Sequence, residues 1–271
     1  TDHKLGFFKT WKNLRKERYE IVISFQMSIF PFIVRAKKRF NFLTKSLFST
    51  RFFTHESVNF MKLIEPYFGS WKEKRLYFPI TETDRQKAKN FFHSHNISSS
   101  TTIVAIHTGN PQMPDRWNAI NYSTVCDTII EEYNARIILF AEQNDPLIEK
   151  IVQYTQNRDK IIKISEITSP REIISILEKV NLAITRGGLF LHLACAAKSP
   201  VISIFGAGNP YRYGPIGTRY IIIHTDMECF PCNKKKKCEK HFECIETISY
   251  EKVVEAARLI LDETKQLILF E

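Results

Sequence analysis

Short apolar runs alternate with longer amphipathic runs from residue 102 to residue 205, and this pattern constrains the fold more than any other feature of the sequence. Runs rich in β-branched residues predict strands at 102–107, 136–140, 160–164, 182–185 and 201–205. Helical spacing between them predicts helices at 118–133, 146–154, 170–179 and 189–197. Strands and helices that alternate in this way form a doubly wound parallel sheet, whose ligands bind at the carboxyl ends of the strands.

A second α/β region, less complete than the first, precedes residue 99. Residues 19–25 form a β-rich run after a basic amphipathic stretch, as in a buried strand that follows a helix. Such a helix normally has an earlier strand before it, and only 18 residues lie upstream. We therefore expect a partial first domain with its linker at 1–98, whose beginning is missing, and a second domain at 99–271 that ends in an amphipathic helix at 249–269.

The net charge of +10 favours an acidic partner, such as a nucleic acid, a nucleotide, a phosphorylated glycolipid or an anionic membrane surface. Residues 35–51 mix basic and aromatic side chains, which suits either a surface that touches lipid or a helix with one apolar and one basic face. No apolar run approaches the roughly 20 residues that cross a bilayer. The charged start also lacks the apolar core of a signal peptide, so we expect a cytoplasmic protein.

Gly187 and Gly188 stand between a predicted strand and a predicted helix. Bare backbone N–H groups and the positive end of a helix dipole can hold a phosphate at such a place, although a tight strand-to-helix turn explains the pair equally well. His192 lies one turn into the helix and could reach a phosphate oxygen, or it could be a buried structural histidine.

Polar residues follow the other predicted strands as well. Thr108 and Gly109 could bind phosphate through a hydroxyl and an amide, and Arg116 offers a guanidinium that matches phosphate oxygens. Glu142 could accept hydrogen bonds from ribose hydroxyls. Each could equally be a solvated loop residue, but their shared position at strand ends favours a binding site.

Residues 187–206, with 209–217 after them, resemble the donor-site signature of the lipopolysaccharide heptosyltransferases of glycosyltransferase family 9. The similarity runs from about Lys12 to the end of the chain. It includes the family's basic-Trp pair at 116–117, its ribose-binding Glu at Glu142, the helix start near the adenine at Thr168, the acceptor-side strand with its Gln at 18–26, and the helix after that strand at 55–69.

The resemblance implies a GT-B-like fold of two Rossmann-like doubly wound domains, the first of them incomplete. It implies transfer of a sugar, heptose, from a nucleotide-diphosphate donor such as ADP-heptose to a lipopolysaccharide core or related lipid-linked glycan. The enzyme would contact the cytoplasmic face of the inner membrane peripherally, bind no nucleic acid and require no metal or other cofactor. The expected donor-binding residues are Thr108, Gly109, Arg116, Glu142, Thr168, Gly187, Gly188 and His192.

Three departures from the family pattern keep a second hypothesis open. Gly187 replaces the usual Asp, and Asp115 replaces a basic residue two positions before Trp117. The family's first glycine-rich loop, with the Asp proposed as catalytic base, lies before residue 19 and is absent. We therefore assign no catalytic residue, and it stays open whether this chain alone is active. The alternative is a catalytically degenerate nucleotide- or glycan-binding protein of the same fold.

Four of the six cysteines lie close together, at Cys229, Cys232, Cys238 and Cys244. The first two have the C-x2-C spacing of a zinc site, but five residues separate the later two, which is a loose match. We favour reduced thiols in a structural loop over a metal site. A nucleic-acid-binding module built on this cluster and the basic surface ranks last, because it leaves the strand-end motifs unexplained.

Overall fold

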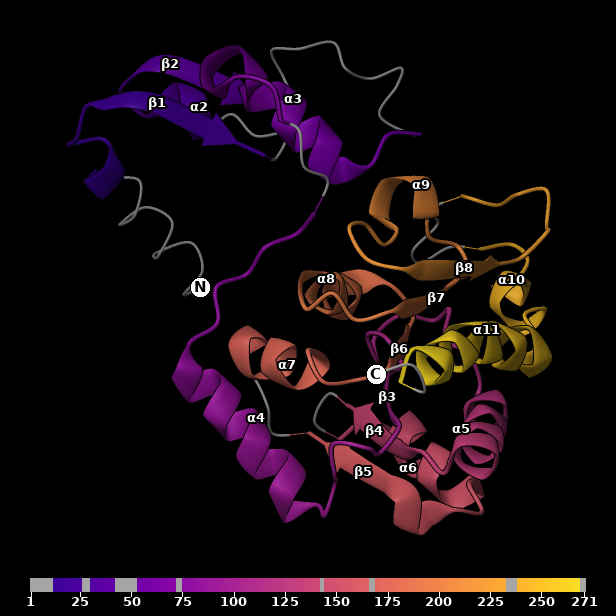
Figure 1. The fold of residues 1–271 in the computed structure, drawn as a ribbon. Helices are drawn as coiled ribbons and strands as arrows, with labels where there is room; N and C mark the ends of the chain where they lie inside the picture. Colours follow the sequence, from indigo (N-terminus) through magenta and orange to yellow (C-terminus); the bar gives the residue numbers. More distant parts are fainter. Residues whose placement is uncertain are drawn as a thin grey trace. The chain divides into compact units, whose positions relative to one another are not determined.

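The chain folds into two compact units, Thr1–Glu73 and Lys74–Glu271. The computed structural model describes residues 12–25, 30–41, 53–71, 75–141, 144–165, 169–232 and 238–268. Each unit combines helices with a parallel sheet (Figure 1). The predicted α/β fold class is therefore confirmed.

The first unit contains a two-stranded parallel sheet of β1 (Tyr19–Ser24) and β2 (Ala36–Asn41), with α2 (Phe30–Ile33) between them and α3 (Glu56–Phe68) after them. β1 confirms the predicted strand. The helix considered for 35–51 is wrong at β2, because its exposed side chains (Lys37, Lys38 and Arg39) are accommodated on a strand with one described neighbour. Residues 42–50 of that stretch lie outside the described residues.

The second unit has a six-stranded sheet in the order β5-β4-β3-β6-β7-β8, and every pairing is parallel. Its strands are β3 (Ile103–His107), β4 (Arg136–Phe140), β5 (Ile161–Ile164), β6 (Leu182–Thr185), β7 (Val201–Phe205) and β8 (Tyr220–His224). The five predicted strands are confirmed to within one residue at each end. β8, an edge strand that is only partly buried, was not predicted from the sequence.

Helices cover both faces of this sheet (Figure 1). They are α4 (Glu82–Ser94), α5 (Ala119–Tyr133), α6 (Pro146–Tyr154), α7 (Pro170–Leu177), α8 (Gly188–Ala196), α9 (Pro210–Tyr213), α10 (Glu243–Glu246) and α11 (Tyr250–Ile268), with a 3-10 turn at Arg158–Lys160. Side chains alternate between the faces along each strand. Val104 and Ile106 pack in one core with α5, α6 and α11, whereas Ile103 and Ala105 pack in a second core with α7 and α8.

α11 confirms the amphipathic helix predicted at the end of the chain. Val253, Ala257 and Ile260 are fully buried on one face, while Arg258 on the opposite face pairs with Glu132 of α5. Neither α11 nor any other helix in the described parts of the chain has the length and apolar character needed to span a membrane.

α4 belongs to the second unit, so the division differs from the predicted boundary between residues 98 and 99. A capping box between Thr81 and Asp84 starts the helix. Ala88 is buried in the core with α7, and Lys87 pairs with Glu172 at the start of α7. Most of the surface of α4 is polar, but its narrow apolar face is enough to dock it against α7.

Replacing Ala88 with Glu tests this placement. We expect the change to lower the free energy of unfolding of the second unit by about 2–3 kcal/mol, because it puts a carboxylate into an apolar core. The measurement is guanidinium unfolding, followed by hydrogen exchange of peptides from β3 to β7. Asn90→Glu, on the exposed face of α4, should have little effect. Equal stability of both variants would contradict the assignment.

Candidate functional site

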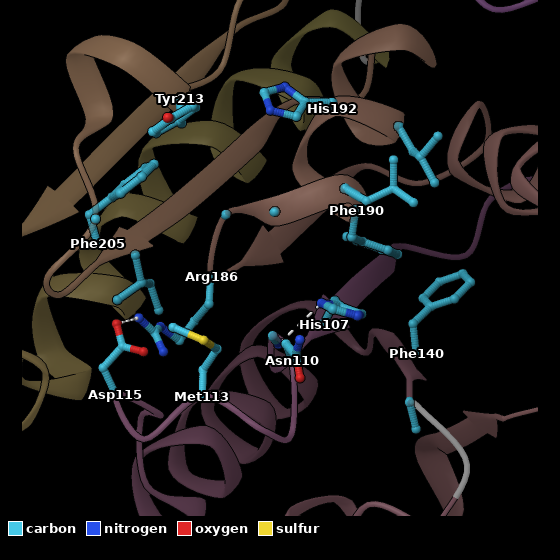
Figure 2. A pocket seen from close by; sticks show the side chains of 18 of the residues that line it. His107, Asn110, Met113, Asp115, Phe140, Arg186, Phe190, His192, Phe205 and Tyr213 are labelled. Carbon is cyan, nitrogen blue, oxygen red and sulfur yellow. Dashed lines mark hydrogen bonds and ion pairs between the residues drawn. The ribbon is translucent and has the colours of Figure 1, made fainter. Parts of the chain in front are cut away.

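A pocket of about 670 Å³ lies at the carboxyl edge of the six-stranded sheet (Figure 2). Its walls come from the ends of five strands and the segments that follow them. The lining residues at these ends include His107 and Gly109 after β3, Phe140 and Ala141 after β4, Ile164 at the end of β5, Arg186 to Gly188 after β6, and Phe205 and Gly208 after β7. The predicted ligand-binding edge therefore does carry a pocket.

The turn from β6 to α8 presents backbone amides to this pocket. Gly187 and Gly188 have φ values of +70° and +76°, which side-chain-bearing residues rarely adopt. Gly187 is the N-cap of α8 and has no side chain to accept a hydrogen bond from the first amides of the helix. A Cβ atom added at Gly188 would meet nothing within 4 Å. The helix start is consequently open to an anion, as the glycine pair predicted.

His107 lies in the pocket wall as a neutral imidazole. Burial, with a smaller effect from the charge of Arg116, lowers the pKa of His107 to about 4. Its Nδ1 accepts a hydrogen bond from the N–H of Gly109 at 3.1 Å, which places the ring proton on Nε2. The ring stacks on Phe190 of α8 with 4.7 Å between centroids. Sequence reasoning missed this residue, because nothing local signals the burial.

Thr108 and Arg116 do not line the pocket. Arg116 donates to both carboxylate oxygens of Asp145, at 2.8 and 2.5 Å, and to the hydroxyl of Thr108 at 2.8 Å. Asp145 also accepts from the N–H of Leu147 and so caps α6. These contacts keep the pKa of Asp145 below its usual value despite its burial. The two side chains predicted to hold a diphosphate thus stabilise the loop around the start of α6 instead.

Arg186 and Asp115 form a second buried ion pair, and both residues line the pocket. Nη2 of Arg186 donates to Oδ2 of Asp115 at 2.8 Å, as Figure 2 shows. The side chains are only 7% and 9% exposed. From the sequence, Asp115 was noted only as the replacement of a basic residue, and Arg186 was given no role. The two residues are 71 positions apart in the sequence but in contact in the structure, so local spacing did not reveal the pair.

The other predicted site residues fall into two groups. His192 of α8 lines the pocket together with Gly109, Gly187 and Gly188. Glu142 and Thr168 lie outside the described residues, although Ala141, next to Glu142, and Ile164, four residues before Thr168, belong to the pocket wall. The structure therefore brings four of the eight predicted residues together.

The cysteines near the end of the chain form a small separate cluster. Cys232, Cys238 and Cys244 pack with Ala207 and Phe242. Burial, with the neighbouring Cys232 and Asp115, raises the pKa of Cys244 to about 11, so its thiol stays protonated at neutral pH. Within the described ranges no three His, Cys, Asp or Glu side chains meet in a geometry that could hold a metal ion.

The lowered pKa of His107 predicts a loss of stability in mild acid. The unfolded chain takes up the proton at pH 6.5, whereas the folded protein resists it until about pH 4. Between these values this histidine alone should remove roughly 3 kcal/mol from the free energy of unfolding. Urea unfolding at several pH values measures how the free energy of unfolding changes with pH. His107→Gln should reduce the slope in this window, and an unchanged slope would show that other groups cause it.

Comparison with known proteins places this chain in a family. The model of "Glycosyltransferase family 9 (heptosyltransferase)" matches residues 7–243. Lipooligosaccharide heptosyltransferase 2 of Campylobacter jejuni is 22% identical over 274 residues, which cover 96% of this chain and 81% of that protein.

Two solved structures share the fold. A family 9 glycosyltransferase of Veillonella parvula matches 94% of this chain and 77% of its own, with a TM-score of 0.75 and 19% identity. The E. coli heptosyltransferase WaaC with ADP matches 93% and 76%, with a TM-score of 0.66 and 12% identity. The family model covers most of the chain, and the predicted GT-B-like fold is confirmed by these neighbours. The chain therefore belongs to glycosyltransferase family 9, the heptosyltransferases, and is a glycosyltransferase enzyme.

Proposed function

We propose that this enzyme binds an ADP-activated heptose in the pocket at the carboxyl edge of the six-stranded sheet and transfers the sugar to a lipid-linked oligosaccharide. The observation that carries the proposal is the open amino end of α8 in the wall of that pocket. The choice of ADP is supported by the structure of WaaC with ADP. The choice of heptose is supported by the family and by the C. jejuni relative.

The diphosphate of the donor would lie at the start of α8. Backbone N–H groups there carry the positive end of the helix dipole, and Gly187 and Gly188 let the phosphates approach without a side chain between them. Gly109 reaches the same pocket from the loop after β3, and His192 lies one turn into α8. Four residues, one on the loop after β3 and three at the turn before α8 and in its first turns, would thus hold one anionic group.

The nucleoside would lie toward the β4 and β5 side of the pocket. Phe140, Ile164 and Ile173 form an apolar wall there, which suits the flat face of a purine. The backbone near Thr168, between two of these residues in sequence, would contact the base. Glu142, next to the lining residue Ala141, would accept hydrogen bonds from the ribose hydroxyls.

Transfer would follow a direct displacement at the anomeric carbon of the sugar. An acceptor hydroxyl forms the new C–O bond, the bond to the diphosphate breaks, and ADP leaves with the electron pair. A base takes the hydroxyl proton, and we assign that base to no residue of this chain. His107 is poorly suited to the task, because its pKa of about 4 makes it a weak base at neutral pH. The helix end stabilises the charge that develops on the leaving diphosphate, so the proposal needs no metal.

The acceptor and the location are further parts of the proposal. The C. jejuni relative is named for lipooligosaccharide, and the net charge of +10 suits an anionic glycolipid at a membrane surface. We propose peripheral contact with the cytoplasmic face of the inner membrane.

Calorimetric titration with ADP, UDP and GDP tests the donor assignment. We expect saturable binding of ADP and weaker binding of the other two nucleotides. Glu142→Ala should abolish detectable ADP binding, because the ribose would lose its carboxylate partner. Incubation with ADP-heptose and a lipid-linked core oligosaccharide should then give a heptosylated product, detected by mass spectrometry. A folded protein that binds none of the three nucleotides would contradict the proposal.

Two glycine variants test the place of the diphosphate. Gly188 and Gly69 both have positive φ, at +76° and +79°, and an added Cβ would meet nothing within 4 Å at either position. Gly188→Ala should weaken ADP binding about tenfold or more, because the methyl group stands where the phosphate approaches and the turn is strained by about 1–2 kcal/mol. Gly69→Ala also puts an alanine at positive φ, but Gly69 is not among the residues that line the pocket, so this variant should leave the affinity unchanged. Similar losses in both variants would argue against the assignment.

A further inference from the structure

The ion pair between Arg186 and Asp115 is built into the wall of the pocket rather than into the core of the fold. Arg186 is the residue between β6 and Gly187, and Asp115 lies in the segment between β3 and α5. Both side chains are more than nine-tenths buried, yet both line the pocket. A charged pair at this place is costly to desolvate, so its position at the pocket surface calls for a functional reason.

Asp115 holds the guanidinium of Arg186 in place, and glycines on two other loops leave room for the side chain. A Cβ atom on Gly109, after β3, would lie 3.3 Å from Cβ of Arg186. A Cβ atom on Gly206, after β7, would lie 3.5 Å from Nη2 of Arg186. The same Nη2 donates a hydrogen bond to Oδ2 of Asp115 at 2.8 Å. The guanidinium of Arg186 therefore has a defined position beside Asp115 and Gly206 in the pocket wall.

Arg186 also keeps hydrogen-bonding capacity that the protein does not use. Its Nε is buried and has no hydrogen-bond partner, and a guanidinium offers five N–H donors in one plane. Arg116 also has a buried Nε without a partner, but both of its terminal nitrogens bind Asp145 or Thr108 outside the pocket, whereas the described hydrogen bond of Arg186 involves Nη2 alone. An anion in the pocket would accept from guanidinium N–H groups that the hydrogen bond to Asp115 does not use.

We propose that Arg186 is the cation that binds the diphosphate of the donor, and that Asp115 is a positioning residue that holds it there. This inference rests on the proposed function, since it takes the nucleotide diphosphate as the ligand of the pocket. It also links two departures from the family pattern. Asp115, which replaces a basic residue of the family, supplies the carboxylate of the pair. Arg186, which directly precedes the Gly187 that replaces the family's Asp, supplies the cation.

The test compares ligands that differ only in phosphate. The affinities of ADP and adenosine are measured by calorimetry, with competition where binding is weak, for the wild type and for the neutral pair Arg186→Gln with Asp115→Asn. The neutral pair leaves no uncompensated buried charge, so it should fold. In the neutral pair we expect the ratio of ADP affinity to adenosine affinity to decrease by about 10-fold to 100-fold relative to the wild type. Adenosine affinity should stay within about twofold, because a nucleoside carries no phosphate for Arg186 to bind.

Two further variants separate binding from structure. Arg186→Lys keeps the charge but loses the planar donors, so its ratio should lie between those of the wild type and the neutral pair. Arg136→Gln is the matched control, because its Nε is also buried without a partner but lies at the opposite, amino edge of the sheet, at the start of β4. We expect this control to keep the wild-type ratio.

The outcomes distinguish the two proposals. An unchanged ratio in the neutral pair, or an equal fall in Arg136→Gln, overturns the role of Arg186 while ADP binding by the wild type still supports the donor site. A wild-type protein that binds adenosine and ADP equally overturns the diphosphate role directly. A wild-type protein that binds neither ligand overturns the proposed function itself, and the role of Arg186 with it.

Discussion

Every strand of the six-stranded sheet runs in the same direction, and the geometry of the second unit depends on that constraint. Parallel neighbours cannot be joined by a tight turn, so a helix crosses over between successive strands and both faces of the sheet become buried. All carboxyl ends then meet at one edge. The connection from β6 to α8 is very short, because only Arg186 and Gly187 separate the strand from the helix. A chain that turns so sharply needs glycine, and glycine leaves the helix amides uncovered.

Two buried arginine–aspartate pairs lie near this edge, and their surroundings give them different roles. Arg116 contacts Asp145 through two nitrogens and contributes to the start of α6, so it acts as part of the scaffold. Arg186 contacts Asp115 through one nitrogen and faces the pocket. The difference lies in what surrounds each guanidinium, since a buried arginine whose donors are mostly paired within the protein has little left to offer a ligand.

The pocket combines a positive helix end with groups that are neutral or neutralised. His107 is uncharged at neutral pH because burial opposes its protonation, and the charge of Arg186 is balanced by Asp115. An anionic ligand would therefore meet fixed donors rather than a strong net charge. Such an arrangement favours oriented hydrogen bonds over long-range attraction, and it is suited to stabilising charge that develops on a leaving group. Under our proposal, the departures at Asp115 and Gly187 rearrange the cation of the site without removing it.

The sequence by itself determined the order of strands β3 to β7 and of the helices between them, the edge that carries the site and the glycine pair at the start of α8, because all of these follow from local periodicity and local turn geometry. The sequence did not place α4 in the second unit, because a narrow apolar face does not by itself indicate which surface it packs against. The sequence also pointed to Arg116 as a pocket residue, whereas Arg186 is the arginine that lines the pocket. The partners of Arg116 and Arg186 lie 29 and 71 residues away, and local spacing carries no information about contacts at such separations. Only the packing of the loops around the sheet decided which guanidinium the scaffold holds and which one the pocket presents.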